Sequence, residues 1–175
     1  MNKLIKETKL YDGKIVKLSL KEYEFNNTKI YREVINHNGG VCVVAVKDDN
    51  IFLVKQYRHA AESYTLELPA GCIEKGETPF ESISREIQEE IGYKANKIEL
   101  LGSFYPTPGY SNELIHIYLA TDLEESKLPE DDDECLEIYT YKVSELKEMI
   151  ENNTIVDGKT MLGIMLYLNK LNNLK

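Results

Sequence analysis

Three glutamates within five residues, Glu86, Glu89 and Glu90, are the residues best suited to chemistry in this chain. On a helix they would spread over an arc of roughly 100°, with Glu86 and Glu90 at the margins of an apolar stripe. Such like charges destabilise a helix by about 0.2–0.5 kcal/mol per pair, and Glu89 and Glu90 would lie near its C-terminus, where the macrodipole disfavours anions. A solvated acidic face is the ordinary interpretation, but a hard cation would offset both costs. Because Mg²⁺ prefers oxygen ligands, the segment indicates a Mg²⁺ site that Mn²⁺ could also fill.

A loop framed by two glycines comes just before these glutamates. Gly71 and Gly76 let backbone carbonyls and amides approach a ligand closely. In the usual phosphate-binding loop the backbone itself contacts the phosphate. Here acidic side chains would bind a metal ion, and the metal ion would bind the phosphate.

The charge balance agrees with a metal-bridged anion and argues against nucleic acid as a partner. The chain has 30 acidic and 21 basic residues, a net charge of −9, whereas nucleic-acid binding needs a basic face. A divalent metal is the simplest bridge between an acidic protein and a small phosphate compound. Only three bases are arginines, Arg32, Arg58 and Arg85, and their planar forks suit phosphate or carboxylate.

The cysteines and the N-terminus indicate a cytoplasmic protein. Cys42, Cys72 and Cys135 are far apart and form no CxxC pair, as expected for reduced thiols. The first residues lack the apolar stretch of a secretory signal, and no apolar run is long enough to span a bilayer. We therefore expect no membrane partner.

A helix must position the glutamates, and residues 78–91 form the clearest one. Residues 78–81 combine a capping box with a proline at the first helical position, and Gly92 supplies a stop. We therefore expect a helix over 78–91. Its apolar residues fall on one stripe that would pack on a sheet, namely Phe80, Ile83, Ile87 and Ile91.

Strands are expected on both sides of this helix. Turn residues at 12–13 and 26–27 separate the segments 14–23 and 28–35. The other expected strands are 41–46, 51–57, 97–104, 114–121 and 135–142, and the other expected helices are 143–151 and 158–171. Strands around a central helix, followed by further helices, describe an α/β sandwich.

The spacing of the loop and helix residues resembles the Nudix box. Gly71, then five residues, Glu77, then seven residues, and then the run from Arg85 to Gly92 match its charged and glycine positions. The one departure is Tyr93, where the pattern prefers an aliphatic residue, and we expect it to affect packing more than chemistry. The resemblance implies that Glu77 and Arg85 hold the loop to the helix by an ion pair.

Flanking segments narrow the resemblance to ADP-ribose pyrophosphatases. The segments that carry it are 32–34, 54–58, 66–71 and 107–113, and the similarity extends over approximately residues 10–170. The implied reaction is the Mg²⁺-dependent hydrolysis of the diphosphate of ADP-ribose, or of a related ADP-sugar, to AMP and ribose 5-phosphate.

The family resemblance also implies a domain plan. Residues 39–175 would form a Nudix-type α/β/α sandwich with a mixed sheet. Residues 1–38 would form an N-terminal antiparallel β arm that crosses to a second subunit in a homodimer.

For the metal, the resemblance implies that Glu86 and Glu90 are ligands, with the backbone carbonyl of Ala70 as a third. Glu89 would contact a second ion. These roles place the cofactor where the helix and the preceding loop meet.

For the substrate, the resemblance implies that Arg58 contacts the diphosphate. Glu67 and Glu113 would contact the substrate or support residues that do. Tyr31 and Arg32, on the N-terminal arm, would help to bind the nucleoside, although an ordinary exposed strand pair is nearly as good an interpretation.

The base that activates water is expected in the acidic segment 129–134, which follows the later strands. Asp132 is the first candidate and Glu134 the second. A run of acids is often only a solvated loop, in which case Glu89 is the alternative.

Two other functions stay open from the sequence. The chain could hydrolyse another nucleotide sugar or a dinucleotide such as NADH. It could also be a non-catalytic ligand sensor, although the intact box and the lack of a basic face argue against that.

Overall fold

The computed structural model describes residues 3–129 and 136–173 and divides the chain into two compact units. The first unit contains Met1–Gly39 and Tyr105–Leu114, and the second contains Gly40–Phe104 and Ile115–Lys175. The sequence had not indicated that the segment 105–114 groups with the N-terminal strands.

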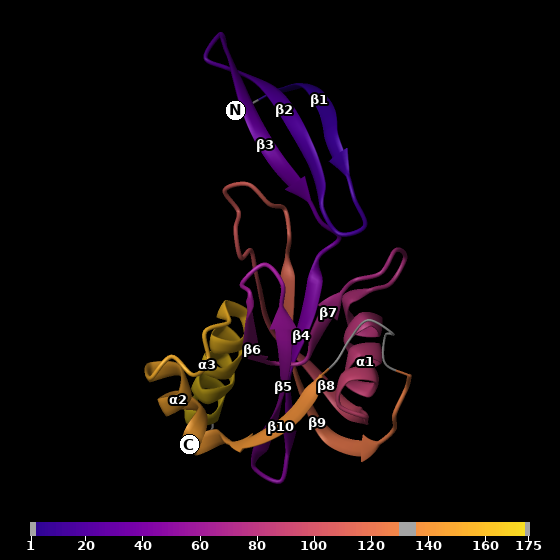
Figure 1. Cartoon of the computed structure of the whole chain (residues 1–175), viewed down its shortest axis with the longest axis vertical. Coiled ribbons are helices and arrows are strands. Elements are labelled where there is room, and N and C mark those ends of the chain that lie inside the picture. The colour runs from indigo at the N-terminus through magenta and orange to yellow at the C-terminus, as the bar shows by residue number, and fades with distance from the viewer. Residues whose placement is uncertain (1–2, 130–135, 174–175) are drawn as a thin grey trace. The chain divides into compact units, whose positions relative to one another are not determined.

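The second unit is built on a mixed seven-stranded sheet. Its strands are β4 (Gly40–Lys47), β5 (Asn50–Arg58), β6 (Ser63–Glu67), β7 (Ala70–Cys72), β8 (Tyr93–Phe104), β9 (Ile115–Glu125) and β10 (Glu137–Lys142). They follow the order β10-β5-β4-β9-β8, with β6 paired to β5 and β7 paired to β4 (Figure 1). β4 and β9 run parallel, whereas β4 and β5 run antiparallel, so the sheet is mixed as expected.

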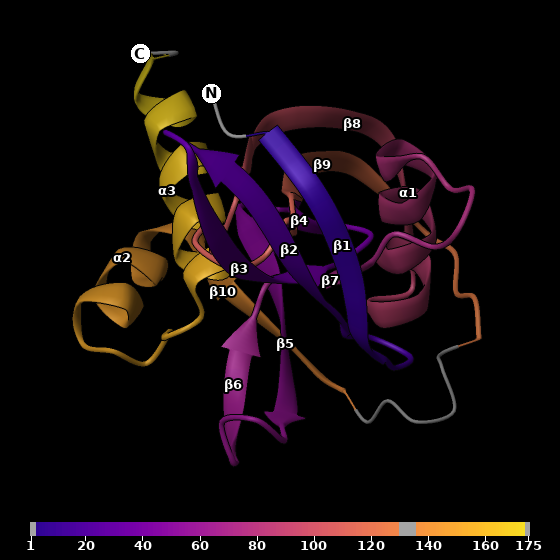
Figure 2. The same cartoon turned by 90° about the horizontal axis from the view of Figure 1, so that it is seen from above.

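Helices cover both faces of this sheet, as Figures 1 and 2 show. They are α1 (Pro79–Glu90), α2 (Val143–Glu151) and α3 (Gly158–Asn173). Alternate residues of β4 point to opposite faces: Val41 and Val43 pack in the core with α1, whereas Val44 packs in the core with α2 and α3. The second unit is therefore the α/β/α sandwich that the sequence predicts.

α1 begins where the sequence predicts. The Thr78 hydroxyl accepts a hydrogen bond from the Glu81 N–H at 3.3 Å, and the Glu81 carboxylate accepts one from the Thr78 N–H at 2.8 Å. This reciprocal pair is the predicted capping box. Gly92 follows the helix with a φ of 73°, a left-handed conformation that favours glycine. Ile83 and Ile87 are completely buried against the sheet.

The first unit contains a three-stranded antiparallel sheet. Its strands, in order, are β1 (Lys3–Asp12), β2 (Lys17–Phe25) and β3 (Thr28–Asn36). Asn26 and Asn27 both have positive φ, which suits the tight turn between β2 and β3. Every residue of β1 is exposed.

Segment Tyr105–Leu114 joins this unit by backbone hydrogen bonds to β3. The Ile35 N–H donates to the Tyr110 carbonyl at 2.7 Å, and the Asn112 N–H donates to the Ile35 carbonyl at 3.2 Å. These bonds tie the loop to the C-terminal end of β3. Segment 107–113, one of the segments that resemble ADP-ribose pyrophosphatases, therefore belongs to the first unit.

Three local expectations from the sequence need correction. Phe80 is 55% exposed rather than part of the buried stripe, because it lies over the edge strand β8 and lines a surface groove there. β8 begins at Tyr93, immediately after the helix, and not at residue 97. β6 and β7 are additional strands, too short to show an alternating pattern.

Tyr93 packs against side chains of the neighbouring strands β4 and β5. Its ring lies 5.1 Å from that of Phe52, and the Lys47 Nζ lies 4.5 Å above it. In the described ranges, no helix is both long and apolar enough to cross a membrane.

Candidate active site

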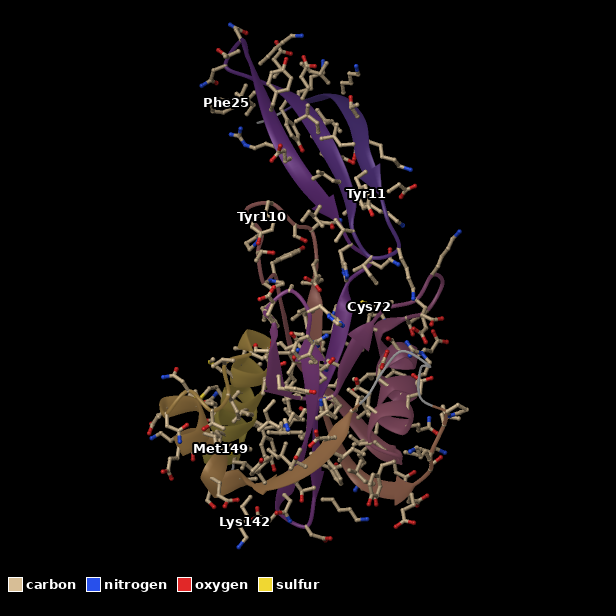
Figure 3. All side chains as sticks on the ribbon, in the orientation of Figure 1. Tyr11, Phe25, Cys72, Tyr110, Lys142 and Met149 are labelled. Carbon is tan, nitrogen blue, oxygen red and sulfur yellow. The ribbon has the colours of Figure 1, made fainter. Side chains whose placement is uncertain are left out.

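The two glutamates predicted to bind metal are buried against the loop that precedes α1. Glu86 is 8% exposed and Glu90 is 2% exposed. The Glu90 Oε2 accepts a hydrogen bond from the Ala70 N–H at 2.8 Å. A Cβ atom on Gly71 would lie 1.9 Å from the Glu86 Oε1, so only glycine leaves room for this carboxylate. The structure thus brings Ala70, Glu86 and Glu90 together beside β7, whose last residue, Cys72, is labelled in Figure 3.

Arg85 joins the loop to the helix. Its Nε and Nη2 donate to the two carboxylate oxygens of Glu77 at 3.0 and 3.2 Å, which confirms the expected ion pair. Its Nη1 lies 2.8 Å from the Glu86 Oε1 and 2.7 Å from the Glu89 Oε2. The hydrogen bond from Arg85 lowers the pKa of Glu77, and the bond to Glu77, together with the charges of Glu86 and Glu89, raises the pKa of Arg85. One arginine therefore aligns three carboxylates.

Arg58 and Glu67 form a second ionic pair at the ends of β5 and β6. The Arg58 Nε and Nη2 donate to the two oxygens of Glu67 at 2.7 and 2.6 Å, a bidentate arrangement. Glu67 is 1% exposed and also accepts a hydrogen bond from the Thr65 hydroxyl. Burial alone would raise the pKa of Glu67, but the bonds from Arg58 and an ion pair with Lys159 outweigh it and hold the pKa at about 2. Because its oxygens are occupied and buried, Glu67 is better placed to orient Arg58 than to contact a substrate.

The sequence did not indicate Lys159, which reaches Glu67 from the first turn of α3. Its Nζ forms an ion pair with the Glu67 Oε2 and another with the Asp157 Oδ2 at 3.0 Å. The local signal for this turn is Asp157 followed three residues later by Thr160, because the Asp157 Oδ2 accepts from the Thr160 N–H as a helix cap. Nothing in that signal points to a partner 92 residues away.

Comparison with known proteins places this arrangement in a family. The model of the NUDIX domain matches residues 36–161. The chain belongs to the Nudix family. It is 36% identical over 166 residues to an ADP-ribose pyrophosphatase of Bacillus subtilis (strain 168), covering 93% of this chain and 90% of that protein. It is 36% identical, with the same coverage, to a methanol dehydrogenase activator of Bacillus methanolicus.

A solved structure supports the fold assignment. The crystal structure of an ADP compounds hydrolase superimposes with a TM-score of 0.89 at 23% identity, covering 99% of this chain and 95% of that one. The family match and the 36% identity to an ADP-ribose pyrophosphatase make the chain a Nudix hydrolase of the ADP-ribose pyrophosphatase-like kind.

Nudix proteins typically use a divalent metal ion, and the residues of this site fit one. Its donors are carboxylate oxygens, and the missing side chain of Gly71 leaves the space that the Glu86 carboxylate fills. Across residues 3–129 and 136–173, no three acidic, histidine or cysteine side chains converge closely enough to hold a metal ion by themselves. Arg85 and the Ala70 N–H hold these carboxylates in the structure. Waters and substrate phosphates would complete the shell, as is usual for Mg²⁺.

The other predicted substrate residues belong to the first unit, whereas the acids of α1 belong to the second. Tyr31 is 53% exposed, and its carbonyl accepts a hydrogen bond from the Arg32 Nη1 at 2.7 Å. The Glu113 Oε1 lies 3.7 Å from the His37 Nδ1. Their part in substrate binding therefore stays a prediction.

Of the three residues predicted as the base, only Glu89 lies among the described residues. Asp132 and Glu134 lie outside the described residues. Glu89, the alternative, is partly buried and paired with Arg85 at 2.7 Å.

Proposed function

We propose that this chain catalyses the Mg²⁺-dependent hydrolysis of the diphosphate of ADP-ribose, giving AMP and ribose 5-phosphate. The observation that carries the proposal is the meeting of an anion-binding arginine and an acidic metal site in one unit. The pKa of Arg58 is raised, chiefly by its hydrogen bond to Glu67 and with a contribution from the charge of Glu90. The ADP-ribose pyrophosphatase of B. subtilis, at 36% identity, supports the choice of substrate.

In this proposal Glu86 and Glu90 bind Mg²⁺ with the carbonyl of Ala70, and Glu89 contacts a second ion. A bound divalent cation supplies Lewis acidity that polarises the diphosphate and lowers the pKa of water. The chain's own contribution is to hold these carboxylates in place before the substrate arrives. Arg85 aligns Glu86 and Glu89, and the Ala70 N–H fixes Glu90.

Arg58 binds the diphosphate through the part of its guanidinium that does not face Glu67. Its side chain is 44% exposed, although two of its nitrogens are fixed by a buried carboxylate. An arginine held in this way neutralises phosphate charge at little further loss of side-chain entropy. Glu113 supports substrate binding, and Asp132 or Glu134 takes the proton from the attacking water.

We further propose a cytoplasmic homodimer, in which residues 1–38 mediate dimerisation and residues 39–175 form the hydrolase domain. Tyr31 and Arg32 would then help to bind the nucleoside held by the other subunit. The exposed strand β1 supports this assignment because an unpaired edge strand is readily covered by another chain.

A substrate panel tests the proposed function. Release of phosphate from the products, after coupling to a phosphatase, is measured with Mg²⁺ for ADP-ribose, GDP-mannose and NADH. We expect the highest kcat/KM for ADP-ribose and no turnover when EDTA is added. A higher kcat/KM for another compound would show that this compound, rather than ADP-ribose, is the preferred substrate. No turnover of any compound with Mg²⁺ or Mn²⁺ would favour a non-catalytic ligand sensor.

A further inference from the structure

Glu67 is a buried carboxylate that two cations share. It is 1% exposed and stands at the end of β6, where Arg58 holds both of its oxygens. The second cation, Lys159, contacts the same Oε2 that receives the Arg58 Nη2. A carboxylate with contacts from two sides has one favoured orientation. Each of the two cations therefore helps to fix the orientation in which the Glu67 carboxylate contacts the other cation.

Lys159 is held where a lysine is otherwise unfavourable. It is the second residue of α3, near the end of the helix at which the macrodipole disfavours a cation. Its side chain is only 13% exposed, so it has lost most of its water. Asp157 and Glu67 together compensate its charge. The four groups Arg58, Glu67, Asp157 and Lys159 then carry two positive and two negative charges and form a neutral network.

α3 is also fixed to the backbone next to Glu67. The Leu68 N–H donates to the Thr160 hydroxyl oxygen at 2.8 Å, and that hydroxyl donates to the Asp157 Oδ2 at 2.6 Å. A Cβ atom on Gly163 would lie 2.5 Å from the Leu68 Cδ1, so this glycine allows the helix to approach Leu68 closely. The first turns of α3 therefore hold both the side chain of Glu67 and the backbone of the following residue.

The consequence for Arg58 follows from its geometry. Arg58 lies at the end of β5 with 44% of its side chain exposed, and its guanidinium donates to both carboxylate oxygens of Glu67. Whatever fixes the Glu67 carboxylate fixes the plane of the Arg58 guanidinium. Through Lys159, α3 therefore helps to fix the orientation of the Arg58 guanidinium, although the helix is far from Arg58 in the sequence.

We propose that Lys159 is a positioning residue for Arg58: it holds the Glu67 carboxylate in the orientation that aims the Arg58 guanidinium at the substrate diphosphate. The proposal rests on the proposed function for the identity of the substrate, but not for the geometry. Lys159 itself contacts Glu67 and Asp157 and has no role at the reacting atoms.

A first experiment measures the orientation of Arg58 without any substrate. Because the chain has three arginines, their Nε–H signals are few enough to assign by NMR in ¹⁵N-labelled protein, with Arg58→Lys to identify the signal of Arg58. In Lys159→Met we expect that signal to shift and to exchange with solvent faster, whereas Lys159→Arg leaves it near its original position. Lys170→Met is the matched control, since Lys170 is on the same helix and forms an exposed ion pair with Glu99 at 2.8 Å. An unchanged Arg58 signal in Lys159→Met overturns the proposal.

A second experiment measures catalysis with ADP-ribose and Mg²⁺. We expect Lys159→Met to raise KM about 10-fold with a smaller change in kcat, Lys159→Arg to restore most of the loss, and Lys170→Met to resemble the wild type. The double variant with Arg58→Ala should be no worse than Arg58→Ala alone, because both changes remove the same contact. Losses that multiply would show that Lys159 acts independently of Arg58, which overturns the proposal.

The two experiments separate the failure of one proposal from that of the other. If the wild type does not hydrolyse ADP-ribose, the proposed function fails, while the NMR signal still decides whether Lys159 positions Arg58. If Lys159→Met does not fold, as judged by near-ultraviolet circular dichroism, Lys159→Met combined with Asp157→Asn replaces it in both experiments. This pair also removes the contact with Glu67, and asparagine keeps the helix cap without leaving an unpaired charge beside the methionine.

Discussion

Single residues explain why the acids of α1 are tolerated where they lie. Glu86 and Glu90 are nearly completely buried, and each has a defined neighbour: the space above Gly71 for Glu86 and the Ala70 N–H for Glu90. Arg85 compensates part of the charge of Glu86. A divalent cation would neutralise the remaining negative charge. Substitutions at Glu90 and Gly71 test this arrangement.

Replacing Glu90 with glutamine should remove most of the metal-dependent activity. The side chain keeps its shape but loses its charge, and we expect kcat/KM to fall at least ~100-fold with the fold unchanged by circular dichroism. Glu151→Gln is the matched control, because Glu151 is also the last residue of a helix but is exposed and forms a surface ion pair with Lys147. Full activity in Glu90→Gln would refute its assignment as a ligand.

Adding a methyl group to Gly71 should damage both stability and activity. The new Cβ would overlap the Glu86 carboxylate, and relieving that overlap should cost about 1–3 kcal/mol in the free energy of unfolding. Urea unfolding measures this change, with Gly158→Ala as the control because its Cβ would meet nothing within 4 Å. Equal stability of Gly71→Ala and the wild type would show that the Glu86 side chain can adopt another conformation without loss of stability.

At the scale of elements, the site is set by four packed segments: α1, the strands β6 and β7 before it, and the first turn of α3. α1 and its loop are joined by the Arg85–Glu77 pair, and β6 is joined to α3 through Glu67 and Lys159. Glu67 is the residue on which the second junction depends, because it is ionised although it is buried.

The ionisation of Glu67 should make stability depend on pH. Its pKa is about 2 in the folded state against 4.5 for the free side chain, so it stabilises the fold fully above pH 4.5 and loses this effect as the pH falls toward 2. We expect about 2 kcal/mol of this stabilisation to be lost between pH 7 and pH 3. Urea unfolding at both pH values should show a smaller loss for Glu67→Gln than for the wild type. Equal losses would mean that Glu67 is not the group that titrates.

The sequence predicts local features of these elements better than their long-range contacts. The start of α1 was predictable because Thr78 and Glu81 form a capping box within four residues. Helical periodicity placed Glu86 and Glu90 at the margin of the apolar stripe, and the structure buries both. The rarity of arginine drew attention to Arg58, whose role came from the family resemblance.

The features that the sequence did not show depend on contacts between residues that are far apart in the sequence. β6 and β7 are short, and their strand conformation comes from partners in β5 and β4 rather than from their own pattern. Lys159 looked like an ordinary helix residue, because its contact with Glu67 exists only once α3 packs against the sheet. Gly163 owes its role to the same packing, through its closeness to Leu68.

At the scale of the whole molecule, the first unit has little core of its own. β1 is an edge strand with exposed apolar side chains such as Leu4, Ile5 and Leu10. A three-stranded sheet of this kind needs a further surface to cover its apolar residues. The proposed homodimer would supply that surface.

Light scattering after size-exclusion chromatography should find a species of about twice the chain mass of 20.1 kDa. Leu10→Asp should shift it toward the single-chain mass, because it places a charge in the apolar surface that dimerisation would bury. Glu7→Gln, on the same strand, serves as the control. A wild type that elutes only at the single-chain mass would contradict the dimer.

The central claim is that the acidic residues of α1 hold a divalent cation, and binding of Mn²⁺ measured by electron paramagnetic resonance tests it without any substrate. We predict that the wild type and Glu151→Gln bind Mn²⁺ equally well. Glu86→Gln and Glu90→Gln should each bind it at least ~10-fold more weakly. Equal binding by all four proteins would contradict the account and place the metal elsewhere.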